Sequence, residues 1–273
     1  MTYDPGAVWF AFGLTVFAGL STGIGSALAF FAKSTNTRFL TASLGFSAGV
    51  MIYVSMIEIF VKARDALTVS MGPSKGYLFT TVAFFSGMAL IALIDKMVPS
   101  FENPHEARSL EDMTPELRDE VKRLKLKRMG MFSALAIAIH NFPEGLATFV
   151  GGLQDPALGI SIAVAIAIHN IPEGIAVSVP LYYATGSRKK AFGLSFLSGL
   201  SEPLGALAGY FIFLRFFSDY VFGLLFAAVA GIMVFISLDE LLPTAEKYGE
   251  HHIAMYGVIA GMVVMASSLV LFV

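Results

Sequence analysis

The chain has 273 residues, of which 56% are hydrophobic and only 14% are charged, and its formal net charge is −2. Soluble domains carry roughly 25% charged residues, so this composition is typical of an integral membrane protein. The slightly negative charge gives no electrostatic support for nucleic-acid binding. The absence of cysteine excludes disulfides and thiolate metal ligands.

Eight stretches of the chain are long and apolar enough to cross a bilayer, which takes about 20 residues. We therefore predict an all-α polytopic membrane protein with a single transmembrane domain over residues 1–273. The connectors carry most of the charge, and only the 99–128 connector is long. The predicted spans are residues 8–32, 42–62, 76–98, 129–151, 158–180, 191–214, 221–242 and 253–273.

Lys and Arg in the connectors predict the orientation of the spans, because basic residues concentrate in cytoplasmic loops. With both termini outside, fourteen of these residues face the cytoplasm and four face outward. The opposite orientation would invert this bias, so we predict that both termini lie outside and that the 99–128 connector is cytoplasmic. Its basic run KRLKLKR suits a solvated helix beside anionic headgroups better than a regulatory site.

Two nearly identical polar motifs interrupt the fourth and fifth predicted spans, HNFPEG at 140–145 and HNIPEG at 169–174. Residues four apart share a face of a helix, and the residue after each His lies about 100° round the helix, next to the same Glu. Each motif therefore gathers three potential ligands. They are His140, Asn141 and Glu144 in the first motif and His169, Asn170 and Glu173 in the second.

Each motif also contains a proline, Pro143 or Pro172, which cannot donate a backbone hydrogen bond. We expect each motif to kink its helix and to free a backbone carbonyl at membrane depth, where protein or a watery cavity must cover it. At 1.5 Å per residue, His140 and His169 both lie about 16 Å below the outer surface, near the middle of a ~30 Å hydrocarbon core. Inverted pairs of this kind are typical of transporters.

Glu202, in the sixth predicted span, brings a third carboxylate to the same depth, and Met51 is central in the second span. Two imidazoles and three carboxylates need compensating charge, which one divalent cation supplies, or two if one Glu bridges them. Nitrogen and oxygen ligands suit Zn²⁺, Fe²⁺, Mn²⁺ and Co²⁺. A packing role explains one such motif but not two at equal depth, whereas Met51 on its own is better explained as a core residue.

Three further acidic residues lie nearer the ends of the predicted spans. Glu58 is toward the outer end of the second span, and Asp239 and Glu240 are at the inner end of the seventh. They are candidates for a cation pathway, but charges near span ends that reach headgroup water explain them equally well.

These residues resemble the ZIP (Zrt-, Irt-like) family of divalent metal transporters, and its bacterial members in particular. The resemblance rests on the paired HNxPEG motifs, on SEPLGALAG at 201–209, and on eight spans with a long third connector. It implies a 3+2+3 inverted repeat, a homodimer, an elevator-like movement, and uptake toward the cytoplasm across the bacterial cytoplasmic membrane.

The resemblance further implies that the divalent metal is a transported substrate rather than a catalytic cofactor, and that a two-metal centre binds it. The first site would comprise His140, Glu144, His169 and Glu173. The second would comprise Asn141, Asn170, Glu173 and Glu202, with Glu173 bridging. Met51 matches a position near the first site. Because relatives vary at the positions of His169 and Asn170, we expect a broad range of substrates, Zn²⁺, Fe²⁺, Mn²⁺, Co²⁺ and Cd²⁺, rather than Zn²⁺ alone.

Two other functions compete with a secondary transporter driven by an ion or metal gradient. An intramembrane zinc metallohydrolase could use two His and a Glu to hold Zn²⁺ and a water, although the HExxH motif is absent. A receptor or structural membrane protein could bury polar pairs for packing alone. Metal flux into proteoliposomes without chemical turnover would separate the three.

Overall fold

The computed structural model describes residues 4–28, 37–97, 138–139, 141–213, 218–248 and 250–271, and all regular secondary structure within them is helical. The 99–128 connector and His140 lie outside these residues. The α-helices and π-helical turns (η) are α1 (Pro5–Leu28), α2 (Thr37–Val54), η1 (Ser55–Ile59), α3 (Phe60–Met71), α4 (Pro73–Met97), α6 (Pro156–Thr185), α7 (Arg188–Gly199), α8 (Ser201–Ala208), η3 (Gly209–Phe213), α9 (Asp219–Ile236), η4 (Ser237–Leu241), α10 (Leu242–Tyr248) and α11 (His251–Leu271). Residues 141–154 are also helical.

Local sequence explains both ends of α6, the helix that carries the second motif. Asp155 is its N-cap and accepts a hydrogen bond from the backbone N–H of Ala157 at 2.9 Å, and Pro156 occupies the first turn. The helix ends at Gly186, whose φ of 63° is the left-handed conformation that glycine adopts most readily. Between these caps α6 passes through Pro172 as one uninterrupted helix.

The predicted spans 42–62 and 76–98 leave 63–75 as a connector, and this prediction is wrong, because α2, η1 and α3 continue as helix as far as Met71. Only Gly72, with φ of 84°, separates α3 from α4, which begins at Pro73. The charged residues after position 61 end the apolar stretch but do not break the helix. The seventh predicted span likewise continues through η4 and α10 to Tyr248.

Six helical segments within the described residues are long and apolar enough to cross a membrane, which supports the prediction of an all-helical membrane protein. The fourth predicted span, 129–151, lies partly outside the described residues. The sixth, 191–214, is divided at Leu200 between α7 and α8. The six segments are Pro5–Ala27, Thr41–Met71, Pro73–Ile94, Pro156–Ile175, Asp219–Glu246 and His251–Val270.

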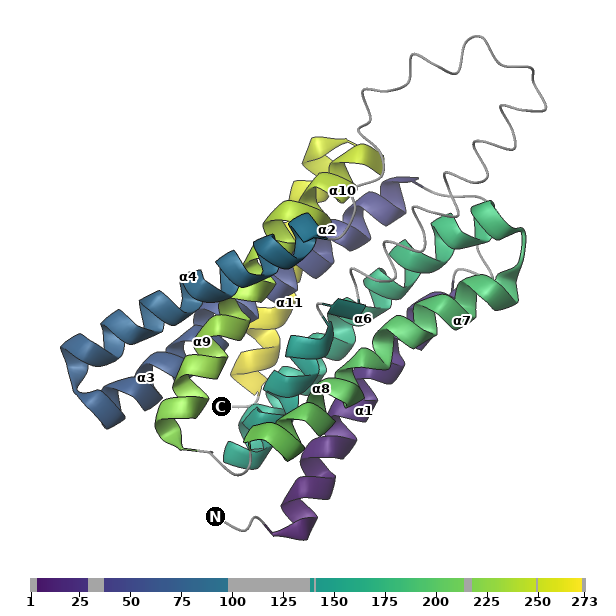
Figure 1. The fold of residues 1–273 in the computed structure, drawn as a ribbon. Coiled ribbons are helices and arrows are strands. Elements are labelled where there is room, and N and C mark those ends of the chain that lie inside the picture. The colour runs from purple at the N-terminus through teal and green to yellow at the C-terminus, as the bar shows by residue number, and fades with distance from the viewer. Residues whose placement is uncertain are drawn as a thin grey trace.

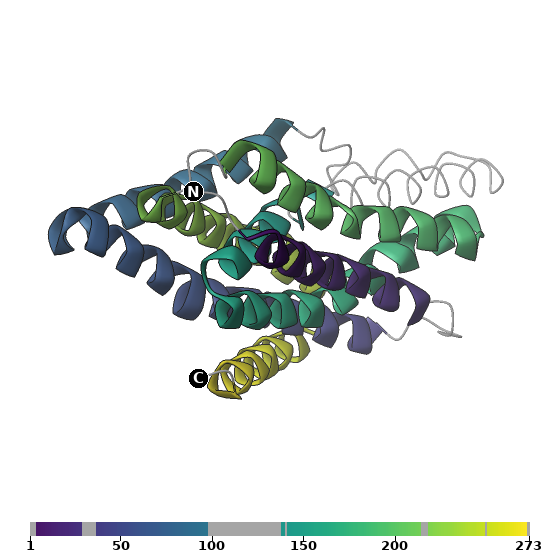
Figure 2. The same ribbon diagram turned by 90° about the horizontal axis from the view of Figure 1, so that it is seen from below.

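The helices form two groups that meet where α2 packs against α6 (Figures 1 and 2). In the first group, α1 packs against α6, α7 and α8. In the second, α11 lies along α2, while α3, α4 and α9 pack on one another. The N-terminal end of α1 and the C-terminal end of α11 lie toward the same end of the molecule as the turn between α3 and α4 (Figure 1). If the chain crosses the membrane an even number of times, its two ends lie on the same side.

Glycines bring the helix backbones of the first group into direct contact, as small residues do in membrane proteins. A Cβ atom on Gly174 would lie 2.1 Å from the carbonyl oxygen of Thr22 in α1, and one on Gly145 would lie 2.0 Å from that of Glu202 in α8. Gly145 and Gly174 are the last residues of the two HNxPEG motifs. The glycine therefore fixes each motif against a neighbouring helix.

Two glycines of α1 provide a matched test of this packing. A Cβ on Gly25 would lie 1.9 Å from the carbonyl oxygen of Ile171, whereas one on Gly13 would have no heavy atom within 4 Å. We expect Gly25→Ala to lower the free energy of unfolding by about 1–3 kcal/mol, because the methyl group must push α1 away from α6. Gly13→Ala should be neutral or slightly stabilising. Thermal unfolding of the detergent-purified proteins measures both, and equal losses would contradict the packing argument.

Candidate metal centre

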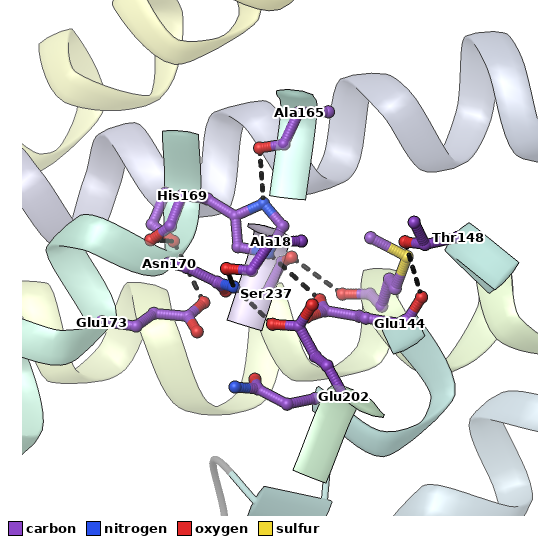
Figure 3. Close-up of polar contacts among 12 residues, drawn as sticks. Ala18, Glu144, Thr148, Ala165, His169, Asn170, Glu173, Glu202 and Ser237 are labelled. Atoms are coloured by element: carbon purple, nitrogen blue, oxygen red, sulfur yellow. Dashed lines mark hydrogen bonds and ion pairs between the residues drawn. The ribbon is translucent and has the colours of Figure 1, made fainter. Parts of the chain in front are cut away.

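The two HNxPEG motifs and Glu202 meet in one buried cluster between residues 141–154, α6 and α8 (Figure 3). The motifs face each other because the chain reverses direction at Asp155. His140 lies outside the described residues, so its place in the cluster stays a prediction. The other predicted ligands from these elements all have 0% exposed surface. They are Asn141, Glu144, His169, Asn170, Glu173 and Glu202.

His169 links the two motifs, and its partners define its tautomer. Its Nδ1 lies 3.1 Å from the carbonyl oxygen of Ala165, and its Nε2 lies 3.2 Å from Oε1 of Glu144. A carbonyl oxygen can only accept, so Nδ1 must carry a proton and Nε2 turns toward the carboxylate. The lone pairs of Nε2 and of the carboxylate Oε1, 3.2 Å apart, repel each other unless a proton or a cation lies between them. A ring N–H held by a backbone carbonyl is the usual arrangement of a metal-ligating histidine.

Asn170 joins Glu202 to α1. Its Nδ2 donates to the carbonyl oxygen of Ala18 at 2.9 Å and also to Oε1 of Glu202. Four buried acceptor oxygens of the cluster have no hydrogen-bond partner among the described residues, and they are Oδ1 of Asn141 and Asn170 and Oε2 of Glu144 and Glu202. Buried acceptors are normally paired. Four unpaired acceptor oxygens in one cluster therefore indicate a site for a hydrogen-bond donor or a cation.

The charge of the cluster indicates the same kind of ligand. It contains three carboxylates, and no Lys or Arg side chain is buried anywhere in the part of the chain that the structure describes. A buried charge without a partner is costly, so these carboxylates must bind a cation or take up protons. Imidazole nitrogen with carboxylate and amide oxygens is a ligand set for a borderline divalent cation.

The described side chains alone do not complete a metal site. Among them, no three His, Cys, Asp or Glu side chains lie close enough together to hold one ion. The predicted first site also includes His140, which lies outside the description, and the predicted second site relies on asparagine oxygens. The assignment of the metal ligands therefore stays a prediction, which the orientation of His169 and the unpaired oxygens support.

Sequence reasoning missed Ser47 of α2. Its Oγ lies 3.2 Å from Oε1 of Glu173 and 3.4 Å from the carbonyl oxygen of His169, and the residue is fully buried. A single serine within the small residues of GFSAGVM gives no signal of a functional role. The only available clue is its spacing, because Ser47 precedes Met51 by four residues and shares its face of α2.

Met51 is fully buried and belongs to the apolar core, as its interpretation as a core residue predicts. A role as a metal ligand stays a prediction. The position of Met51 one turn beyond Ser47 on α2 is consistent with either role.

The three predicted pathway residues lie in π-helical turns. Glu58 is in η1 and half-buried, while η4 contains the exposed Asp239 and the half-buried Glu240. Glu58 follows Ser47 by eleven residues of continuous helix, which places it roughly 16 Å away along the axis and outside the cluster. Single π-helical turns are frequent at functional sites, but their presence does not by itself identify a pathway.

Comparison with known proteins identifies the family. A family model described as ZIP Zinc transporter matches residues 98–268. The protein named Zinc transporter ZupT from Chlorobaculum parvum is 64% identical over 266 residues, which is 97% of this chain and 98% of that protein. The protein of the same name from Chlorobium chlorochromatii is 65% identical over 268 residues, 97% of this chain and 98% of that protein.

A third protein named Zinc transporter ZupT, from Lysinibacillus sphaericus, is 62% identical over 268 residues, which cover 98% of this chain and 99% of that protein. The resemblance that the HNxPEG motifs indicated is thus confirmed over nearly the whole sequence. The chain belongs to the ZIP family of zinc transporters.

Proposed function

We propose that this chain is a secondary transporter that moves Zn²⁺ and similar divalent cations toward the cytoplasm through the buried His, Glu and Asn cluster. The observation that carries the proposal is the orientation of His169, whose Nδ1–H is held by Ala165 while Nε2 faces Glu144. A cation between these two groups would accept a lone pair from each and so take both as ligands. Because the family consists of transporters, the metallohydrolase alternative is excluded.

The ligand types fit a transported ion rather than a permanently bound one. Neutral amide oxygens share the cluster with carboxylates and imidazole, and a site without thiolates releases its cation more readily than a structural zinc site does. The proposed first site is formed by His140, Glu144, His169 and Glu173, and the second by Asn141, Asn170, Glu173 and Glu202. The same ligands accommodate Fe²⁺, Mn²⁺, Co²⁺ and Cd²⁺, so we include these ions in the proposed range.

The proposed topology has eight crossings. Residues 129–151 and the α7–α8–η3 segment add two to the six candidate spans. Both termini lie outside, and the spans form a 3+2+3 inverted repeat in a bacterial cytoplasmic membrane. The distribution of Lys and Arg supports this orientation. The homodimer that the family resemblance implies stays a prediction.

Zinc uptake into proteoliposomes tests the proposed first site. We expect Glu144→Ala and Glu173→Ala each to reduce the initial rate of radioactive zinc uptake by at least about tenfold, because each removes an anionic ligand. Glu250→Ala is the control, since it removes a carboxylate that pairs with Arg38 at the surface. Uptake at the control rate in either folded cluster variant would contradict the assignment.

The stoichiometry of metal binding tests the proposed second site. Glu202→Gln keeps the shape of the side chain but removes the charge that faces Asn170. Equilibrium dialysis of the purified protein should show about two Zn²⁺ ions per chain falling to about one, because the first site keeps its own carboxylates. An unchanged count would remove Glu202 from the ligand set.

The absence of native cysteine makes the proposed orientation simple to test. We expect a membrane-impermeant thiol reagent to label Lys75→Cys in intact cells, but to label Lys189→Cys only after the membrane is opened. Both positions are exposed, so accessibility within the folded protein is matched. Labelling in the reverse order would place the termini inside.

A further inference from the structure

We infer that Ser47 is a positioning residue of the metal centre, and that it holds the carboxylate of Glu173 from the opposite helix group. The inference rests on the proposed function and deepens it. The Oγ of Ser47 lies 3.2 Å from Oε1 of Glu173, and both side chains are fully buried. Glu173 is the residue proposed to bridge the two metal sites, so its orientation affects both.

The helix that carries Ser47 is tightly fixed. A Cβ atom on Gly45 would lie 2.2 Å from the carbonyl oxygen of Ala254, and one on Gly49 would lie 2.1 Å from that of Val258. The backbones of α2 and α11 therefore touch at two successive turns. At about 100° per residue, Ser47 lies on the side of α2 away from both glycines, where α6 packs. Its hydroxyl thus reaches Glu173 from a backbone that cannot easily shift.

The chemistry of the contact favours a role in ordering the ligand. The serine hydroxyl has one proton, and its two acceptors are Oε1 of Glu173 and the more distant carbonyl oxygen of His169, at 3.4 Å. A hydrogen bond to a carboxylate is the stronger of the two, because the acceptor is charged. A carboxylate oxygen has two lone pairs, so Oε1 can accept this bond and still bind a cation.

A fixed donor also lowers the entropic cost of metal binding. Glutamate has three side-chain torsions, and immobilising them on binding costs free energy. A hydroxyl that holds the carboxylate beforehand removes part of this cost, as preorganised groups do in other binding sites. Without it, the incoming ion must order Glu173 itself, so affinity falls while the movement of the loaded transporter is unaffected.

Ser55 provides a matched control, because it belongs to the same continuous helix and is also fully buried. Its hydroxyl has no hydrogen-bond partner among the described residues. Ser55→Ala therefore removes a hydroxyl oxygen from an equally buried position, as Ser47→Ala does, but it removes no hydrogen bond to a proposed ligand. A role of buried serine as a small packing residue would affect both positions alike.

The test is zinc uptake into proteoliposomes, measured as a function of zinc concentration. We expect Ser47→Ala to raise the KM for Zn²⁺ by about tenfold with little change in the maximal rate, as the loss of an outer contact to a ligand does. Ser55→Ala should keep the KM of the wild-type protein. Ser47→Thr, which retains the hydroxyl, should give a KM closer to the wild-type value than Ser47→Ala does.

Three results of this uptake experiment would contradict the role of Ser47. An unchanged KM in Ser47→Ala, an equal rise in Ser55→Ala, or a KM in Ser47→Thr as high as in Ser47→Ala would overturn the inference. Should Ser47→Ala lose its folded state in thermal unfolding, the comparison of Ser47→Thr with the wild-type protein decides, because a KM raised tenfold despite the retained hydroxyl refutes the role. Absence of saturable zinc uptake by the wild-type protein would instead refute the proposed function.

Discussion

Direct contact between helix backbones is the constraint on which the metal centre depends. Each motif places its glutamate immediately before a contact glycine, in Glu144-Gly145 and Glu173-Gly174. Because these glycines touch the backbones of α8 and α1, neither lipid nor bulky side chains can enter between the helices. The adjacent carboxylates are thereby sealed from the bilayer and turned toward one another. The glycine of each motif therefore serves packing, whereas its polar residues are the candidate ligands.

Complete burial has a consequence for transport. The described candidate ligands have no exposed surface, so an ion can reach them only when some covering element moves. One such cover is α2, which contacts α6 from the other helix group and binds Glu173 through Ser47. Movement of other covering elements, with this hydrogen bond kept, would open the cluster. Such a displacement is consistent with the elevator-like movement that the family resemblance implies.

Composition and motif spacing predicted the helical membrane fold and the meeting of the two motifs, because burial of apolar surface and the antiparallel direction of two spans are simple constraints. The end of α3 was missed because Lys62, Arg64 and Asp65 end an apolar stretch without breaking a helix. The helix ends instead at Gly72, which has a positive φ.

Two prolines show why helix breaks are hard to predict. Pro203 lacks an N–H group for the carbonyl of Gly199, and the sixth predicted span is divided nearby at Leu200. Pro172 also lacks a backbone N–H group, yet α6 continues through it. The backbone on either side of Pro172 is held against α1, by Gly25 at Ile171 and by Gly174 itself. A proline therefore divides one helix and not the other, and the local sequence does not distinguish the two cases.

The two motifs are almost identical in sequence but not in surroundings. Glu144 faces an imidazole, Glu173 is bound by a serine hydroxyl, and Glu202 is held by the amide of Asn170. On the proposed ligand sets, the first site contains imidazole nitrogen, while the second is made of oxygens alone. Nitrogen ligands favour Zn²⁺, whereas carboxylate and amide oxygens favour harder cations such as Mn²⁺. On these proposed sets the two sites are unequal because both histidines belong to the first and both asparagines to the second.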